Sequence, residues 1–217
     1  MVFFSNKKKV NKAINIVKKR NIENLRRKVR ILVVDDEDFS IIDTLKTRGY
    51  DIYKKNDITY PIETEPFDIV LLDIKGIASK FASPMEGFGF ALEIKKRYPQ
   101  KIVISFSGTS DAKINERLNE INGFIYKDTD IDTWCSRLDG YIKKYCDVNY
   151  QWECIAGKMK SDGIEDNIIN TLKDCFIDGY ENNTFDDFSR TFMEHVNNAK
   201  FLMETLNLLV SLLQLVC

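Results

Sequence analysis

The chain of 217 residues is 44% hydrophobic and 30% charged, a composition that allows a buried core and argues against disorder throughout. Its net charge of −1 conceals an asymmetry, because residues 1–30 carry eleven Lys and Arg against one acid, Glu23. The apolar start at residues 2–4 is too short for a secretory signal, and the stretch 201–216 is too short and too polar to span a membrane. We therefore expect a cytoplasmic protein.

Cysteine usage argues against a structural zinc site. The five cysteines are odd in number, lack CxxC spacing and are accompanied by a single histidine, His195. Structural zinc needs four ligands, which usually come in closely spaced pairs. We expect reduced thiols, as in a cytosolic protein, and an ordinary surface position for His195.

Periodicity divides the first two thirds of the chain into helices and strands. Apolar residues at helical spacing predict a basic helix over 8–27. Short β-branched runs then predict five strands, at 29–36, 51–57, 67–74, 101–107 and 123–127. Helical spacing and stop signals predict the intervening helices, at 38–50, 87–98, 110–120 and 129–145. This alternation predicts an α/β fold, with a parallel sheet covered by helices on both faces.

The remainder of the chain has a different character. Residues 147–162 are predicted to be a linker or irregular segment, and residues 163–180 a helix. A last helix is expected to begin near Thr184 and run toward the C-terminus. It is apolar over most of its circumference, so it must be covered by the rest of the chain, by a second chain or by a partner helix. The predicted organisation is a basic arm, an α/β domain and a linker with a helical extension, at 1–28, 29–147 and 148–217.

Chemically active side chains follow four of the predicted strands. Asp35 and Asp36 follow the first strand, Asp73 ends the third, Ser107 ends the fourth and Lys127 ends the fifth. The carboxyl ends of parallel strands meet at one edge of a sheet, where ligands bind. Crowded carboxylates require a cation, and oxygen ligands favour a hard ion such as Mg²⁺. A metal and a lysine beside one carboxylate would stabilise negative charge on a phosphoryl group, so the pattern predicts a phosphoryl-acceptor site.

Four segments carry a family resemblance. VRILVVDDE, FDIVLLDI, KIVISFSG and GFIYKD resemble, in order and spacing, the signature strands of response-regulator receiver domains. The resemblance extends over residues 30–145. It implies a five-stranded, doubly wound, flavodoxin-like sheet and a phosphoprotein of two-component signalling or a phosphorelay.

The resemblance also implies roles for individual residues. Asp73 corresponds to the aspartate that takes a phosphoryl group from a histidine kinase or another phosphodonor. Asp36 and Asp73 would bind Mg²⁺ directly, together with the backbone carbonyl of Lys75, and Asp35 would act largely through water. The family's phosphate-binding lysine and the switch positions would be Lys127, Ser107 and Phe124.

The sequence departs from the family pattern at two places near this site. Asp128 follows Lys127, where the family usually has proline, and the loop 74–87 is about six residues longer than usual. We interpret the longer loop as a surface insertion or as a lid over Asp73.

Two other functions stay open from the sequence. The chain could be a pseudo-receiver, which is an interaction module that phosphate does not switch. It could also be a nucleic-acid-binding regulator that uses the basic arm, or the arm could make weak contact with an anionic membrane. The helical extension lacks a DNA-reading motif, so we expect no sequence-specific DNA binding. We expect protein partners or self-association through the C-terminal helices, and no enzymatic activity beyond self-dephosphorylation.

Overall fold

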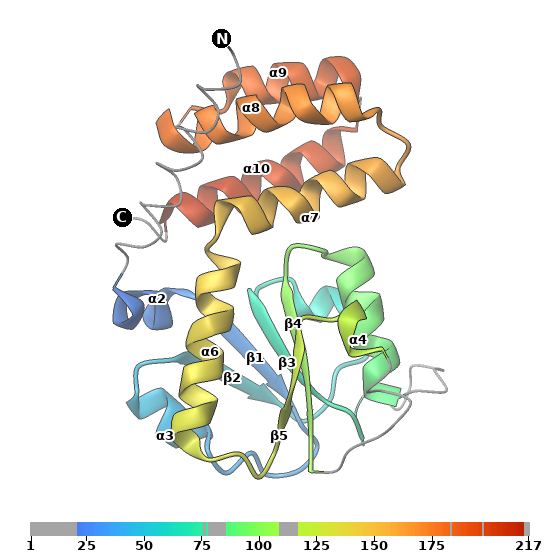
Figure 1. Cartoon of the computed structure of the whole chain (residues 1–217). Coiled ribbons are helices and arrows are strands. Elements are labelled where there is room, and N and C mark those ends of the chain that lie inside the picture. Colours follow the sequence, from blue (N-terminus) through green and yellow to red (C-terminus); the bar gives the residue numbers. More distant parts are fainter. Residues whose placement is uncertain are drawn as a thin grey trace. The chain divides into compact units, whose positions relative to one another are not determined.

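The structure is a computed structural model that describes residues 21–75, 77, 86–108, 117–182, 184–196 and 198–214. They form two compact units (Figure 1). We call residues Asn21–Tyr145 the sheet unit and the described residues from Cys146 onward the helical unit. Most of the basic helix predicted over 8–27 lies outside the described residues, and its last part is helix α2, Ile22–Lys28.

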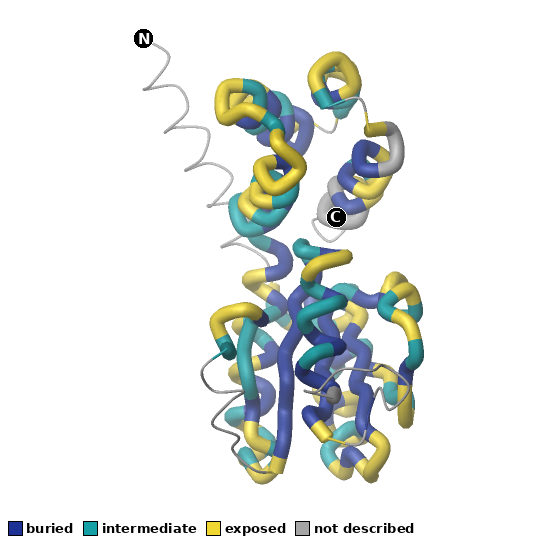
Figure 2. Tube along the Cα trace, turned by 90° about the vertical axis from the view of Figure 1, so that its right-hand side faces the viewer, coloured by how far each residue is buried: buried dark blue, intermediate teal, exposed yellow. Residues whose placement is uncertain are grey.

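The sheet unit is built on five parallel strands in the order β2-β1-β3-β4-β5, which confirms the predicted flavodoxin-like fold. The strands are β1 Arg30–Val34, β2 Asp51–Lys55, β3 Ile69–Asp73, β4 Ile102–Ser107 and β5 Gly123–Tyr126. The central strand β3 and its neighbour β4 are buried along their whole length (Figure 2). Their continuous apolar runs reflect this burial, because both faces of a doubly wound sheet are covered.

Helices lie on both sides of the sheet (Figure 1). On one side, Phe106 of the sheet contacts Phe39 and Trp134, with ring centroids 5.4 and 6.2 Å away. On the other, Phe88 and Phe90 are fully buried against the sheet. Besides α2, the described part of this unit contains the helices α3 Ile42–Thr47, α4 Glu86–Arg97 and α6 Ile131–Tyr145, with 3-10 turns η1 Pro61–Thr64 and η2 Leu118–Glu120. Most of the helix predicted over 110–120 lies outside the described residues.

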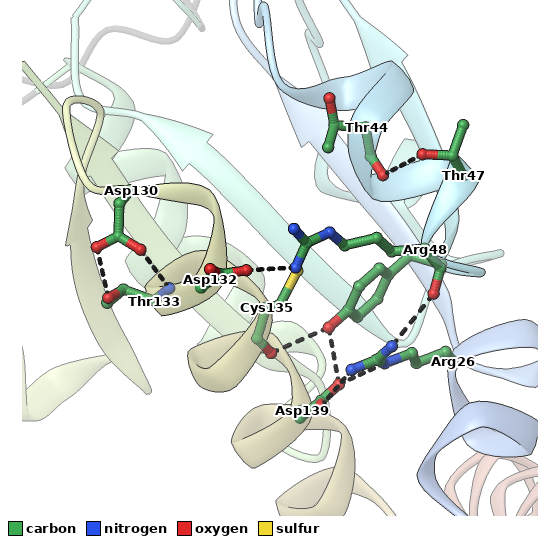
Figure 3. Close-up of polar contacts among 10 residues, drawn as sticks. Arg26, Thr44, Thr47, Arg48, Asp130, Asp132, Thr133, Cys135 and Asp139 are labelled. Carbon is green, nitrogen blue, oxygen red and sulfur yellow. Dashed lines mark hydrogen bonds and ion pairs between the residues drawn. The ribbon is translucent and has the colours of Figure 1, made fainter.

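A polar network joins α2 to α6 and to the end of α3 (Figure 3). Arg26 donates two hydrogen bonds to Asp139, of 2.8 and 2.6 Å, and its guanidinium lies 4.7 Å from the Tyr50 ring centre. The Tyr50 hydroxyl donates to the Asp139 carboxylate at 2.8 Å and to the Cys135 carbonyl at 3.0 Å. Beside this group, Arg48 donates to Asp132 at 2.6 Å. These contacts make α2 part of the sheet unit.

The amino end of the sheet holds a buried lysine. Lys101 precedes β4, is 6% exposed, and donates hydrogen bonds to the carbonyl oxygens of Glu65 and Phe67. Burial lowers the pKa of Lys101 to about 8, although Asp68 and Glu65 oppose the shift. This charge lies at the opposite end of the strands from Asp73.

The helical unit contains four helices, which corrects two predictions from the sequence. They are α7 Val148–Ser161, α8 Asp166–Asn182, α9 Asp186–His195 and α10 Ala199–Gln214. The segment predicted as a linker over 147–162 is helical, because Asp147 caps its first turn and Val148, Trp152 and Ile155 give it a buried face. The single helix predicted from near Thr184 is two helices, α9 and α10.

Aromatic rings form a core within the helical unit. Trp152 contacts Phe176 at 5.1 Å, which contacts Phe188 at 5.9 Å; Phe192 follows at 5.7 Å and Phe201 at 5.5 Å. The rings come from all four helices, so this unit has a core of its own. No helix in the described part of the chain combines the length and apolar character needed to cross a membrane.

Candidate functional site

Five of the seven predicted site residues meet in a pocket at the carboxyl ends of the strands. The pocket has a volume of about 210 Å³. It is lined by Asp36, Glu37, Asp73, Lys75, Ser107, Gly108 and Lys127. The parallel register places these residues together, since Asp73 lies opposite Phe106 and Ser107 lies opposite Tyr126, directly before Lys127.

Lys127 binds three carboxylates in this pocket. Its Nζ lies 2.6 Å from Asp73 Oδ2, 3.2 Å from Asp35 Oδ1 and 3.3 Å from Glu37 Oε2. Burial alone would lower the pKa of Lys127, but the hydrogen bonds with Asp73 and Asp35 raise it above its ordinary value. Lys127 is therefore charged at neutral pH.

The Asp73 carboxylate is buried and strongly held. It is 4% exposed, and the backbone N–H of Lys75 donates to its Oδ1 at 3.3 Å. Burial raises the pKa of Asp73, while the bonds from Lys127 and the Lys75 amide oppose that rise. Lys127 thus compensates the Asp73 carboxylate, which burial makes costly to ionise, and also contacts Asp35 and Glu37.

The carboxylates fit a hard cation. Oxygen atoms of Asp35, Glu37 and Asp73 lie within 4.8 Å of one another. Asp35 is fully buried, and its Oδ2 finds no hydrogen-bond partner among the described residues. A buried carboxylate oxygen without a partner is costly, and a divalent cation with oxygen ligands such as Mg²⁺ would satisfy it.

Glu37 is the site residue that sequence reasoning missed. Its N–H donates to Asp35 Oδ1 at 3.0 Å, so the turn after β1 brings its side chain over Lys127. Asp36, predicted as a direct ligand, lines the pocket but is not in the close carboxylate group. Direct binding of a metal by Asp36 and by the Lys75 carbonyl stays a prediction.

The two predicted switch residues lie in different surroundings. Ser107 is 3% exposed and lines the pocket, and its carbonyl accepts the N–H of Lys127 at 2.9 Å. Phe124 is half-buried, packs against the core that contains α4, and contacts Tyr126 at 4.8 Å. Their switching roles stay predictions.

Of the two departures from the family pattern, only Asp128 lies wholly within the described residues. No peptide bond in the described ranges is cis, and that includes the bond between Lys127 and Asp128. The lid or insertion predicted over 74–87 falls mostly outside the described residues. Where the chain returns, at Gly87, an added Cβ would lie 2.2 Å from the carbonyl oxygen of Asp73. Only glycine fits so close to the end of β3.

Comparisons with known proteins give matches among solved structures alone. No family model matches the chain, and no curated protein matches it. Among solved structures, it is similar to a response regulator receiver domain protein from Methanospirillum hungatei JF-1, with 22% identity, a TM-score of 0.43, and coverage of 54% of this chain and 95% of that one.

Two further solved structures are similar to this chain. One is the signal receiver domain of an HD domain-containing protein from Pseudomonas fluorescens Pf-5, with 21% identity, a TM-score of 0.46, and coverage of 55% and 90% of the two chains. The other is a response regulator from Thermotoga maritima, with 16% identity, a TM-score of 0.44, and coverage of 53% and 98%. The sheet unit has the flavodoxin-like fold by its own strand order and register, and the chain carries an additional helical unit.

Proposed function

We propose that this chain is a response-regulator receiver protein that accepts one phosphoryl group on Asp73 with the help of Mg²⁺. The observation that carries the proposal is the bond of 2.6 Å between Lys127 Nζ and Asp73 Oδ2, beside the buried Asp35 and inside an open pocket. An ordinary ion pair would need neither a second buried carboxylate nor a pocket. A phosphoryl-transfer site needs both.

The residues of the chain have distinct tasks in this reaction. A carboxylate oxygen of Asp73 attacks the phosphorus of the donor, the bond from phosphorus to the donor breaks, and an acyl phosphate forms. The Lys127 ammonium then hydrogen-bonds the phosphoryl oxygens in place of the free Asp73 carboxylate. The Ser107 hydroxyl, on the neighbouring strand, is a second donor to the new phosphoryl group.

The carboxylates would also hold the cation. Asp35, Asp36 and Asp73 with the Lys75 carbonyl would bind Mg²⁺, and Glu37 lies close enough to join them. When bound, Mg²⁺ would neutralise charge on the carboxylates and on the transferred phosphoryl group. The orphaned Asp35 Oδ2 supports such a cation here.

The proposed partner is a cytoplasmic histidine kinase or another phosphodonor, and the output is a change in protein contacts. No enzymatic activity is proposed beyond self-dephosphorylation, which is hydrolysis of the acyl phosphate on Asp73.

Acetyl phosphate and MgCl₂ test the proposal on the full-length chain. The intact mass should rise by one phosphoryl group, and the gain should vanish without Mg²⁺ or in Asp73→Asn. Lys127→Met should reduce the rate of gain at least tenfold, whereas the exposed Lys160→Met should not. A chain that never gains this mass, or one that gains it equally in Asp73→Asn, would favour the pseudo-receiver.

A further inference from the structure

The last helix, α10, has one apolar face buried inside the helical unit. Phe201, Leu202, Thr205 and Leu208 are between 2% and 7% exposed. Phe201 contacts Phe192 of α9 at 5.5 Å, and the Lys158 ammonium of α7 lies 5.0 Å from its ring. This inner face accounts for the packing of α10 on its own unit.

A second apolar face of α10 is open to solvent. Met203 is 55% exposed, Val210 is 46% exposed, and Leu206 between them is half-buried. We call these three residues the outer stripe. They lie on the side of the helix away from Thr205 and Leu208, because residues separated by three and four positions share a face.

The spacing of the outer stripe is that of a helix–helix seam. Its residues follow at steps of three and four, and in the sequence Ala199 and Leu213 hold the preceding and following positions of the same repeat. The inner face of α10 is enough to pack it on its own unit. A second row of apolar residues with helical spacing is not needed for that packing. Apolar residues repeated in this way pack into the holes between side chains of a facing helix.

The charge distribution indicates which kind of molecule covers the outer stripe. Residues 148–198 hold ten acids and four bases, whereas α10 holds one base and one acid, Lys200 and Glu204. A basic partner would be drawn to the acidic helices α8 and α9, not to the neutral α10. Two copies of the same acidic unit, in contrast, can approach with least repulsion through their neutral apolar helices.

We propose that two copies of this chain associate through the outer stripes of their α10 helices, which face each other about a two-fold axis. A symmetric contact uses the same surface on both copies, so one stripe on each chain suffices. The proposal is independent of the chemistry at Asp73 and goes beyond it, because it assigns a surface and an occupant to the helical unit.

Sedimentation equilibrium of the full-length chain tests this assignment. The unaltered chain should be a dimer with a Kd below about 100 µM. Met203→Glu and Val210→Glu should each weaken association at least tenfold, because each places a charge in the seam. The matched control is Ile62→Glu in the sheet unit, where the replaced side chain is 44% exposed, and it should leave the dimer unchanged.

Circular dichroism shows whether each variant is folded. A monomeric full-length chain, or a dimer that survives both charged variants, overturns the proposal. A monomer that dimerises once residues 1–20 are deleted also overturns it, since the basic arm would then be the occupant. If Met203→Glu alone loses its thermal unfolding transition, that variant is unfolded. The association of Val210→Glu, at the other end of the stripe, then decides whether the dimer forms through α10.

Discussion

Replacing Gly87 by alanine should damage the site without touching any of its functional side chains. The new Cβ would meet the carbonyl oxygen of Asp73 at 2.2 Å, Ile77 Cγ1 at 2.9 Å and the carbonyl oxygen of Ile74 at 3.1 Å. Two of these three atoms belong to the backbone, so they cannot rotate away. Either the start of α4 or the end of β3 must move.

The size of the movement sets the expected effect. Ordinary contact begins near 3.4 Å, so the end of β3 and the start of α4 must separate by about 1 Å. Overpacking of this kind costs about 1–3 kcal/mol of unfolding free energy. A displacement of about 1 Å would also stretch the Lys127–Asp73 bond and slow phosphoryl transfer by about 100-fold.

The measurement pairs two glycine variants of the same pocket region. Gly108 also lines the pocket, but an added Cβ there meets no atom within 4 Å. We expect Gly87→Ala to lower both the urea midpoint and the rate of labelling by acetyl phosphate, and Gly108→Ala to change neither beyond a few tenths of a kcal/mol. Equal labelling rates for Gly87→Ala and the unaltered chain would refute this reasoning.

Three further changes test other parts of the structure. Arg26→Met should lower the unfolding free energy of the sheet unit by about 1–3 kcal/mol in urea, because it leaves Asp139 with only the Tyr50 hydroxyl, whereas the exposed Arg27→Met should cost little. Gly157→Ala should stabilise the helical unit against heat by up to about 1 kcal/mol, since the added methyl group meets open space within α7. Lys101→Met should change the pH dependence of stability. The pKa of Lys101 is lowered from 10.5 to about 8 in the folded protein. Between pH 8 and pH 10.5 the unfolded chain therefore binds more protons than the folded protein, and the unaltered protein gains stability as the pH rises. Relative to Lys101→Met, the unfolding free energy of the unaltered protein should rise by at most about 3 kcal/mol over this pH range. Urea unfolding at several pH values measures this rise.

Each of these predictions has an outcome that contradicts it. Equal losses in Arg26→Met and Arg27→Met would mean that the bonds to Asp139 add nothing. A lower melting temperature for Gly157→Ala would mean that α7 is crowded on its outer side. Parallel pH profiles for the unaltered chain and Lys101→Met would mean that Lys101 keeps an ordinary pKa.

The strands and the central site residues could be predicted because each follows from local sequence. A strand buried on both faces must be apolar throughout, and the carboxyl ends of parallel strands must meet. Asp73, Ser107 and Lys127 therefore come together in any parallel sheet with this strand order. Those inferences need no knowledge of side-chain packing.

Other features could not be predicted because tertiary contacts decide them. Glu37 joins the site only through the turn that its N–H makes with Asp35. Gly87 matters only because the chain returns against the end of β3. The attachment of α2 depends on Asp139, which is 113 residues away from Arg26 in the sequence.

The missed helix α7 has a different cause. Val148, Trp152 and Ile155 follow helical spacing, and Asp147 is a good N-terminal cap, so the signal was present in the sequence. The change in composition after the receiver-like segments favoured a linker instead. The linker prediction was wrong, because helical spacing is the stronger signal in residues 148–161.

The central claim is that Asp73 carries the phosphoryl group, and its most direct test is to locate that group. After labelling with acetyl phosphate and Mg²⁺, borohydride reduction converts an aspartyl phosphate into homoserine, which tandem mass spectrometry can place in a peptide. We predict homoserine at position 73 and an unmodified aspartate at positions 35 and 36. Homoserine at another position, or an unreduced Asp73 in a chain that carries the phosphoryl mass, would contradict the proposed mechanism.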